Sequence, residues 1–306
     1  MNNGRTIAVT GGFGYSGRFV VQRLLAGGHV VRSLSNSAAP QVSSAQPVIT
    51  HPLCFEKPAQ LTEALSGVDT LINTYWVRFN YRFFTHAQAV ANSQVLFNCA
   101  KAAGVRRVVH VSISNPDRGQ HLEYFSGKAQ LESALTASGL SYSIVRPAVL
   151  FGHDDILINN IAWFLRHLPV FGVPGNGRYG IRPIYVEDFA DLLVSQVEGT
   201  ENVTLDAIGP ESFTFRELVE TLARILGLRR MIISVPPLLS YWVTRLLGVW
   251  LGDVILTREE IQGLLANTLA VEGRATGTTR LTEWAAREHR NLGRRYHNEL
   301  NRRIHK

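Results

Sequence analysis

The sequence contains very little cysteine: two residues, Cys54 and Cys99, in a chain of 306. Neither belongs to a C-x-x-C pair, so the sequence predicts neither a disulfide-stapled extracellular fold nor a cysteine metal cluster. The 10 histidines also lack H-E-x-x-H or a similar metal-ligand spacing. We therefore expect reduced thiols, no metal site and a cytoplasmic protein.

Long uncharged apolar runs are absent as well. The N-terminal region reaches only a short apolar stretch at residues 6–10, too short for the core of a secretory signal. The most apolar region, 236–256, is interrupted by Arg245, Asp253 and two glycines, whereas a membrane-spanning helix needs about 20 largely uncharged residues. No transmembrane span is predicted. A buried or groove-lining helix is the favoured interpretation of this region, and an interfacial membrane contact is the alternative.

Acidic residues are outnumbered, and the formal charge is +7. The C-terminal tail is rich in basic residues, namely Arg287, Arg290, Arg294, Arg295, Arg302, Arg303 and Lys306. Such a tail is typical of a solvated helix face, and a surface for an anionic partner is the second interpretation. No nucleic-acid motif or aromatic interleaving accompanies the charge, so we predict no nucleic-acid partner.

What the sequence does contain is an alternation of short β-branched runs with longer helical patterns. This alternation predicts right-handed crossovers and an α/β fold with a Rossmann-type, doubly wound parallel sheet. The predicted strands are 6–10, 30–35, 48–50, 70–74, 107–112 and 141–145, and the predicted helices are 14–26, 59–65, 86–103 and 122–137.

After Arg146-Pro147 the sequence becomes rich in glycine, proline and aromatic residues, and residues 168–177 have the composition of a loop. Further strands are expected at 184–186, 203–207 and 231–235. We therefore expect a dinucleotide-binding domain over residues 1–150, with returning segments near 181–207. Residues 151–306 are expected to form a smaller substrate-binding lobe interwoven with it.

A glycine-rich turn lies between the first predicted strand and the first predicted helix. Gly11, Gly14 and Gly17 give the pattern G-x-x-G-x-x-G, with Phe13 and Tyr15 between them. A turn without Cβ atoms lets backbone approach a pyrophosphate, and helix N-terminal N–H groups then face the anion. The position at a first βα turn favours nicotinamide dinucleotide binding. The alternative is a glycine-rich turn that binds nothing.

The choice between NAD and NADP is usually made at the end of the second strand. An acidic residue there accepts the ribose hydroxyls, and a basic one favours a 2′-phosphate. In this chain the position falls on Ser35 or Asn36, and Arg32 can assist if its side chain faces the site. The missing carboxylate gives a weak preference for NADP over NAD.

Tyr124 and Lys128 are spaced to lie one helical turn apart on one helix face. An ammonium beside a phenol stabilises the phenolate and lowers its pKa, which suits general acid/base chemistry. The preceding predicted strand ends at Ser112 and is followed by Ser114, which are candidate hydroxyl donors. The alternative is a surface Tyr–Lys pair on an amphipathic helix.

These features together resemble a short-chain dehydrogenase/reductase of the extended or atypical type. The matching stretches are 10–17, 104–112, 124–128, 144–152 and 185–190. The chain also resembles NAD-dependent epimerase/dehydratase proteins and the NADPH-binding accessory subunit of respiratory complex I. The resemblance implies Tyr124 as catalytic acid/base, Lys128 on the nicotinamide ribose, and Ser114 or Ser112 orienting the substrate oxygen. Asn73, at the end of its strand, joins the cofactor-binding candidates.

The chain also departs from its relatives. Residues 51–54 carry no aspartate near the adenine, and Tyr124 follows Ser114 by only ten residues. Arg182 lies one position from the arginine with which sugar-nucleotide epimerases hold substrate phosphate, and a one-residue offset in a strand turns a side chain to the other face. The candidate substrate-facing residues are His153, Asn159, Asn160 and Arg182.

Two functions follow from this sequence. The first is an NAD(P)-dependent oxidoreductase or epimerase in which hydride moves between nicotinamide and an alcohol or carbonyl carbon while Tyr124 transfers the proton. The second is an NAD(P)-binding assembly or stabilising protein with little or no turnover, at a membrane-associated complex. The aromatic-rich helix around residues 242–250 and the basic tail favour the second.

Overall fold

The computed structural model describes residues 4–36 and 48–304, which divide into two compact units. The first comprises the described residues up to Arg146 together with Phe189–Asp206, and the second comprises Pro147–Asp188 and the described residues from Ala207 onward. The chain therefore leaves the first unit after Arg146, returns to it for one helix and one strand, and leaves it again.

The first unit is built around a seven-stranded sheet with the strand order β11-β6-β5-β4-β1-β2-β3, and every pairing from β6 to β3 is parallel. The strands are β1 Thr6–Thr10, β2 Val30–Leu34, β3 Ile49–His51, β4 Thr70–Asn73, β5 Arg107–Val111, β6 Ser141–Pro147 and β11 Val203–Ala207. The chain builds outward from β1 to β3, then returns beside β1 with β4 and builds the other way. A dinucleotide binds at the carboxyl edge of such a sheet, where the order reverses between β1 and β4.

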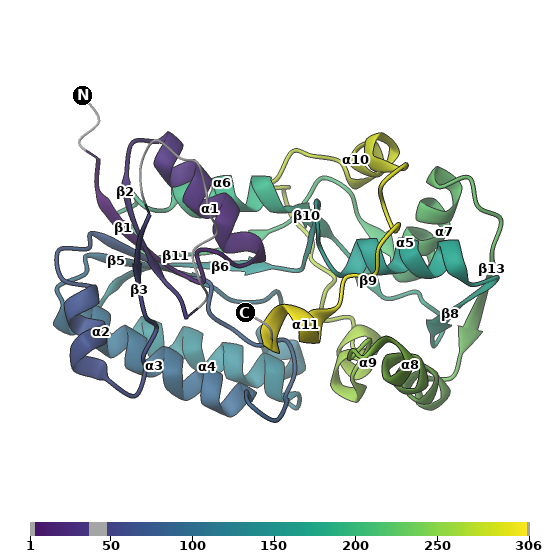
Figure 1. The fold of residues 1–306 in the computed structure, drawn as a ribbon, viewed down its shortest axis with the longest axis horizontal. Helices are drawn as coiled ribbons and strands as arrows, with labels where there is room; N and C mark the ends of the chain where they lie inside the picture. The colour runs from purple at the N-terminus through teal and green to yellow at the C-terminus, as the bar shows by residue number, and fades with distance from the viewer. Residues whose placement is uncertain (1–3, 37–47, 305–306) are drawn as a thin grey trace. The chain divides into compact units, whose positions relative to one another are not determined.

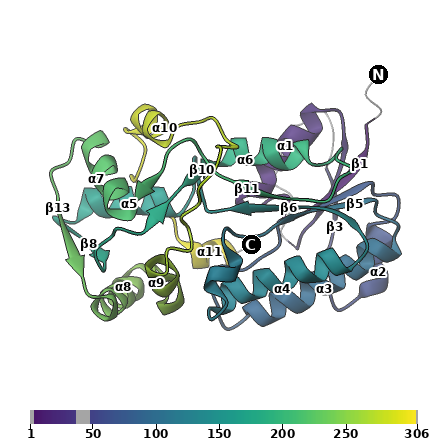
Figure 2. The same ribbon diagram turned by 180° about the vertical axis from the view of Figure 1, so that it is seen from behind.

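Helices cover both faces of this sheet, as the doubly wound prediction requires (Figures 1 and 2). One face carries α1 Tyr15–Ala26 and α6 Val186–Ser195, and the other carries α2 Pro58–Ala64, α3 His86–Ala102 and α4 Glu123–Ala137. A short 3-10 helix, η1 Pro116–Gly119, precedes α4. The predicted Rossmann-type α/β fold is confirmed.

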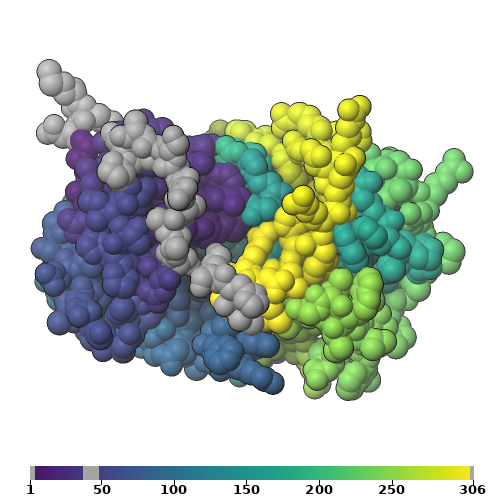
Figure 3. Space-filling view, in the orientation of Figure 1, coloured from purple at the N-terminus to yellow at the C-terminus, as the bar shows by residue number. Residues whose placement is uncertain are grey.

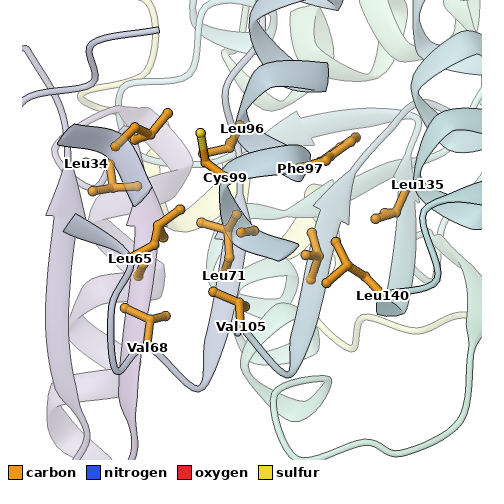
Figure 4. Close-up of a cluster of buried hydrophobic side chains, with 14 of the residues drawn as sticks. Leu34, Leu65, Val68, Leu71, Leu96, Phe97, Cys99, Val105, Leu135 and Leu140 are labelled. Atoms are coloured by element: carbon orange, nitrogen blue, oxygen red, sulfur yellow. The ribbon is translucent and has the colours of Figure 1, made fainter. Parts of the chain in front are cut away.

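The core of the first unit lies between the sheet and helices α2, α3 and α4 (Figure 4). Leu34, Leu71 and Val108 project from the strands onto Leu96, Leu131 and other apolar residues of the helices, and all of these are buried. β4 is buried at every position and β5 at all but its last, as expected for a parallel sheet covered on both faces. The packed core fixes the carboxyl edge of the sheet, where the candidate site lies.

The second unit combines three small two-stranded sheets with helices. Its strands are β7 Val149–Phe151, β8 Val170–Pro174, β9 Gly180–Ile181, β10 Pro183–Tyr185, β12 Phe213–Thr214 and β13 Met231–Val235. Its helices are α5 Leu157–His167, α7 Phe215–Ile225, α8 Pro237–Leu251, α9 Arg258–Leu265, α10 Leu281–Glu288 and α11 Glu299–Ile304. Phe151, Ile158, Phe215 and Trp284 belong to its buried core.

Two sequence predictions for this unit are wrong. Residues 168–177 are not all loop, because Val170–Pro174 form β8, which pairs in parallel with β13 from a distant part of the chain. The interpretation of 236–256 as a buried helix also fails, because α8 leaves most of its large apolar side chains exposed, and its groove-lining alternative stays a prediction. Within the described ranges, no helix is both long enough and apolar enough to cross a membrane.

Candidate functional site

The β1–α1 turn has the geometry that a dinucleotide pyrophosphate requires. Gly11 adopts a positive φ of 61°, and the Gly14 N–H donates to the Gly11 carbonyl at 2.8 Å. A Cβ at Gly17 would lie 2.1 Å from that same carbonyl oxygen, so only glycine fits there. The first turn of α1 carries no acidic residue, and its N-cap residue, Gly14, has no side chain that could cap the helix. The turn therefore fits a bound anion. Phe13 and Tyr15 lie half-buried in it.

A hydrogen-bond network fixes the neighbouring β1–β4 switch point. The Thr10 hydroxyl donates to Oδ1 of Asn73 at 2.9 Å and accepts the Thr74 N–H at 2.8 Å. Nδ2 of the fully buried Asn73 lies 3.1 Å from Nδ1 of His110. Because an amide N–H only donates, Nδ1 of His110 accepts and the proton sits on Nε2. The Asn73 amide thus holds the strand ends together, and its expected contact with the cofactor stays a prediction.

Burial and the nearby charge of Lys128 hold the pKa of His110 well below its ordinary value, so this imidazole is neutral. Its Nε2 has no hydrogen-bond partner among the described residues. The strand end beneath the site therefore carries a fixed, uncharged donor.

The side chains at the end of β2 are largely engaged within the protein. The Arg32 guanidinium donates to the carbonyl oxygens of Ala64 at 2.9 Å and Ser66 at 2.7 Å, at the end of α2. The Asn36 amide both accepts from the Leu53 N–H and donates to the Leu53 carbonyl. Ser35 follows β2 directly and bonds through its backbone N–H to His51. Arg32 could pair with a 2′-phosphate only if its guanidinium broke these hydrogen bonds to Ala64 and Ser66.

Lys128 is the most unusual ionisable group of the first unit. Its side chain is 2% exposed, and its ammonium donates to the Val111 carbonyl at 2.7 Å. Desolvation lowers the pKa of Lys128 from 10.5 to about 7, although the charge of Glu132 acts in the opposite direction. The ammonium also lies 4.4 Å from the centre of the Trp76 ring, a cation–π distance.

Tyr124 shares this aromatic neighbour. Its ring meets Trp76 edge-on at 5.7 Å between centroids and meets His86 edge-on at 5.6 Å, and Trp76 and His86 stack on each other. Gly127 makes room for the indole, because a Cβ there would lie 3.0 Å from Cη2 of Trp76. Tyr124 and Lys128 are thus brought to one aromatic cluster. Trp76 and His86 were missed at the sequence level.

Both candidate serines are buried in the segment after β5. The Ser112 backbone N–H donates to Val145, while its hydroxyl has no hydrogen-bond partner among the residues the structure describes. Ser114 is fully buried one residue before Asn115, which adopts the left-handed conformation with φ of 46°. The structure therefore leaves both serines open as candidates.

Three of the four candidate substrate residues hold loops of the second unit together. Asn159 donates to the His153 carbonyl and to Asp155, and the Asn160 amide makes two bonds to the backbone of His297. Arg182 donates to the carbonyl oxygens of Gly209 and Gly273. Their contact with a substrate stays a prediction.

His153 differs from these three. Its Nε2 lies 2.7 Å from Oε1 of Glu187 and 2.9 Å from the Tyr185 hydroxyl, which donates to the same carboxylate. His153 adopts a positive φ of 54°, and its side chain is 42% exposed. Tyr185 and Glu187 belong to the stretch 185–190 that carries the family resemblance, yet neither was counted among the site residues.

Comparisons with known proteins agree with this geometry. Residues 11–160 match the family model described as NAD(P)H-binding. The chain is 25% identical over 267 residues to the mitochondrial NADH-ubiquinone oxidoreductase 40 kDa subunit of Neurospora crassa, covering 85% of this chain and 70% of that protein.

Two solved structures share the fold. An NADPH-dependent quinone oxidoreductase from Escherichia coli, complexed with NADPH, has a TM-score of 0.75 at 21% identity, covering 94% of this chain and 99% of that one. The UDP-glucose 4-epimerase of Thermotoga maritima has a TM-score of 0.64 at 20% identity over 76% of this chain and 85% of that one. Residues 11–160 therefore form an NAD(P)H-binding domain, and the chain shares the fold of these two solved structures.

Proposed function

We propose that this protein is an NAD(P)-dependent oxidoreductase acting on an alcohol or carbonyl substrate, with Tyr124 as the acid/base. The observation that carries the proposal is the state of Lys128, a buried amine with a pKa near 7 one helical turn from Tyr124. Burying an ammonium lowers the stability of the folded chain. A buried lysine one helical turn from a tyrosine is therefore more easily explained by a functional role than by a structural one. The family resemblance implies proton transfer by the same pair.

Each residue has a defined task in this scheme. The β1–α1 turn would hold NAD(P)H, which would supply hydride for the carbonyl carbon. The Tyr124 hydroxyl gives its proton to the carbonyl oxygen, and Lys128 in its protonated form stabilises the phenolate that remains. A hydroxyl of Ser112 or Ser114 donates a hydrogen bond to the same oxygen. The reverse reaction, oxidation of an alcohol, returns the proton to Tyr124.

The name of the Escherichia coli structure supports a quinone as one carbonyl substrate to test. The neutral end of β2 supports NADP(H) over NAD(H), because Ser35 and Asn36 place no carboxylate against a 2′-phosphate. The engagement of Arg32 with α2 keeps this preference weak.

Replacement of Tyr124 by Phe tests the proposal. We expect NADPH-dependent turnover of a quinone or carbonyl substrate to fall by about 10²–10⁴-fold, because the acid is removed while the ring packing is kept. Binding of NADPH, measured by quenching of tryptophan fluorescence, should stay unchanged. Tyr81→Phe removes a phenol elsewhere in the first unit and serves as the control. Unchanged turnover in Tyr124→Phe would refute the acid/base role.

A second function, NAD(P)-dependent assembly or stabilisation of a larger complex, is favoured by the exposed apolar face of α8. The relative from Neurospora crassa is itself named as a subunit of NADH-ubiquinone oxidoreductase. The two functions separate in one assay. Submicromolar NADPH binding without turnover across a panel of quinones, aldehydes and ketones supports assembly, and measurable turnover that Tyr124→Phe abolishes supports catalysis.

A further inference from the structure

Helix α8 reverses the usual pattern of a helix packed on a globular core. Seven of its large apolar side chains are between 45% and 79% exposed, namely Leu238, Leu239, Trp242, Val243, Leu246, Val249 and Trp250. At 100° per residue these positions form one continuous stripe. The opposite side turns the small residues Ser240 and Gly248 inward, and a Cβ at Gly248 would lie 2.5 Å from the Asp253 carbonyl oxygen. The helix therefore packs by its small residues and presents its large apolar ones.

The sequence from Leu222 to Arg258, which contains this stripe, is cationic. From Leu222 to Arg258 the only acidic residue is Asp253, which is 7% exposed and accepts hydrogen bonds from Tyr296 and from the backbone of Glu299. The same stretch holds the arginines Arg224, Arg229, Arg230, Arg245 and Arg258, four of which are exposed. Arg245 lies at the edge of the stripe itself. A partner for this face must therefore be apolar where it meets the stripe and negatively charged where it meets Arg245.

We propose that α8 is an interfacial helix that binds the surface of an anionic lipid bilayer. A bilayer interface of this kind offers both properties, since acyl chains accept the stripe and anionic headgroups pair with arginine. Trp242 and Trp250 have the amphipathic rings that concentrate at headgroup level. In a dimer formed through α8, by contrast, the arginines of the two copies would face and repel each other.

The length of α8 fixes its orientation. Its 15 residues extend about 22 Å at 1.5 Å per residue, which is shorter than the roughly 30 Å hydrocarbon core of a bilayer. The helix therefore lies in the plane of the interface, with its stripe in the acyl boundary. In the space-filling view the green segment that contains α8 forms part of the outer surface of the second unit (Figure 3).

Vesicle co-sedimentation of the full chain tests this proposal. We expect binding to vesicles of phosphatidylcholine with 30% phosphatidylglycerol, about tenfold weaker for the double variant Leu246→Glu, Trp250→Glu. Arg245→Gln should weaken binding about fivefold, the effect of one arginine near an anionic surface. Phe83→Glu, at an exposed apolar residue of the first unit, and Arg290→Gln in the tail are the matched controls. Unaltered circular dichroism and NADPH affinity establish that each variant is folded.

Two results would overturn the proposal. Equal binding to pure phosphatidylcholine vesicles would remove the role of the anionic headgroup. Alternatively, sedimentation velocity without lipid could show a dimer that the double variant dissociates, together with no vesicle binding by the wild type, in which case the occupant is a second copy. Neither result bears on turnover, so the proposed function is tested independently.

Discussion

At the scale of single residues, the lowered pKa of Lys128 should make the free energy of unfolding depend on pH. The folded chain binds the Lys128 proton with a pKa of about 7, against 10.5 for a solvated lysine. Between these two values the unfolded chain holds the proton and the folded chain does not, so stability rises with pH across this window. The burial cost is greatest below pH 7, where the ammonium must be kept charged inside the protein.

We therefore predict that wild type becomes more stable relative to Lys128→Met by about 2 kcal/mol between pH 7 and pH 9. Methionine keeps the apolar length of the side chain and has no titrating group. Urea unfolding at pH 7, 8 and 9 measures the difference in free energy of unfolding. Lys101→Met, at an exposed lysine, should leave the pH dependence of wild type intact. A difference between wild type and Lys128→Met that stays constant with pH would contradict the buried-ammonium assignment.

The same residue shows what sequence reasoning can and cannot find. The four-residue spacing of Tyr124 and Lys128 predicts a shared helix face, because helix geometry is local. Trp76 lies 52 positions before Lys128 in the sequence and comes near it only because β4 and β5 pair in parallel and α4 packs behind them. No local pattern around Trp76 signals that contact. Neighbours that come from distant parts of the chain, such as Trp76, are therefore the residues of the site that the sequence does not predict.

At the scale of elements, the glycine turn makes the most specific prediction. In Gly17→Ala the new methyl would lie 2.1 Å from the Gly11 carbonyl oxygen, so the β1–α1 turn must open. We expect NADPH affinity to fall by about a hundredfold, since the backbone can no longer approach the pyrophosphate. Fluorescence titration measures the dissociation constant.

The matched control is Gly27→Ala, the same substitution at the other end of α1. A Cβ there would meet its nearest neighbour, the His29 ring, at 3.2 Å, a contact that a side chain can relieve. We expect NADPH to bind this variant as it binds wild type. Equal loss of affinity in both variants would show that helix stability, and not the turn, limits binding.

Elements of the first unit were predictable to within a residue or two at most boundaries, whereas in the second unit this holds for β10 and β13 but not for β8. The strand β1 occupies 6–10 as expected, and α1 starts at Tyr15 where residue 14 was predicted. These strands are short apolar runs between turn signals, so their pattern is local. By contrast, β8 contains Gly172 and ends in Pro174, and it is held as a strand by β13, some 60 residues later. Composition there indicates a loop until the partner strand is known.

At the scale of the whole molecule, NAD(P)H binding should couple to folding. A ligand that binds only the folded chain stabilises it by about 2.7 kcal/mol at a hundred times its dissociation constant. The residues expected to face the cofactor at the glycine turn and the β1–β4 switch point all belong to the first unit. Saturating NADPH should therefore raise the unfolding temperature by about 5 °C. Slowed amide exchange should concentrate in β1, α1 and the end of β4.

Comparison of the two coenzymes then tests the cofactor preference on the same readout. Ser35 and Asn36 bring no negative charge to the end of β2, so a 2′-phosphate meets no repulsion there, and the shift with NADPH should equal or exceed that with NADH at equal concentration. Substituting Ser35→Asp introduces the missing carboxylate and should reverse the order. A larger shift with NADH for the wild type would overturn the NADP preference, and no shift with either coenzyme would remove the basis for both proposed functions.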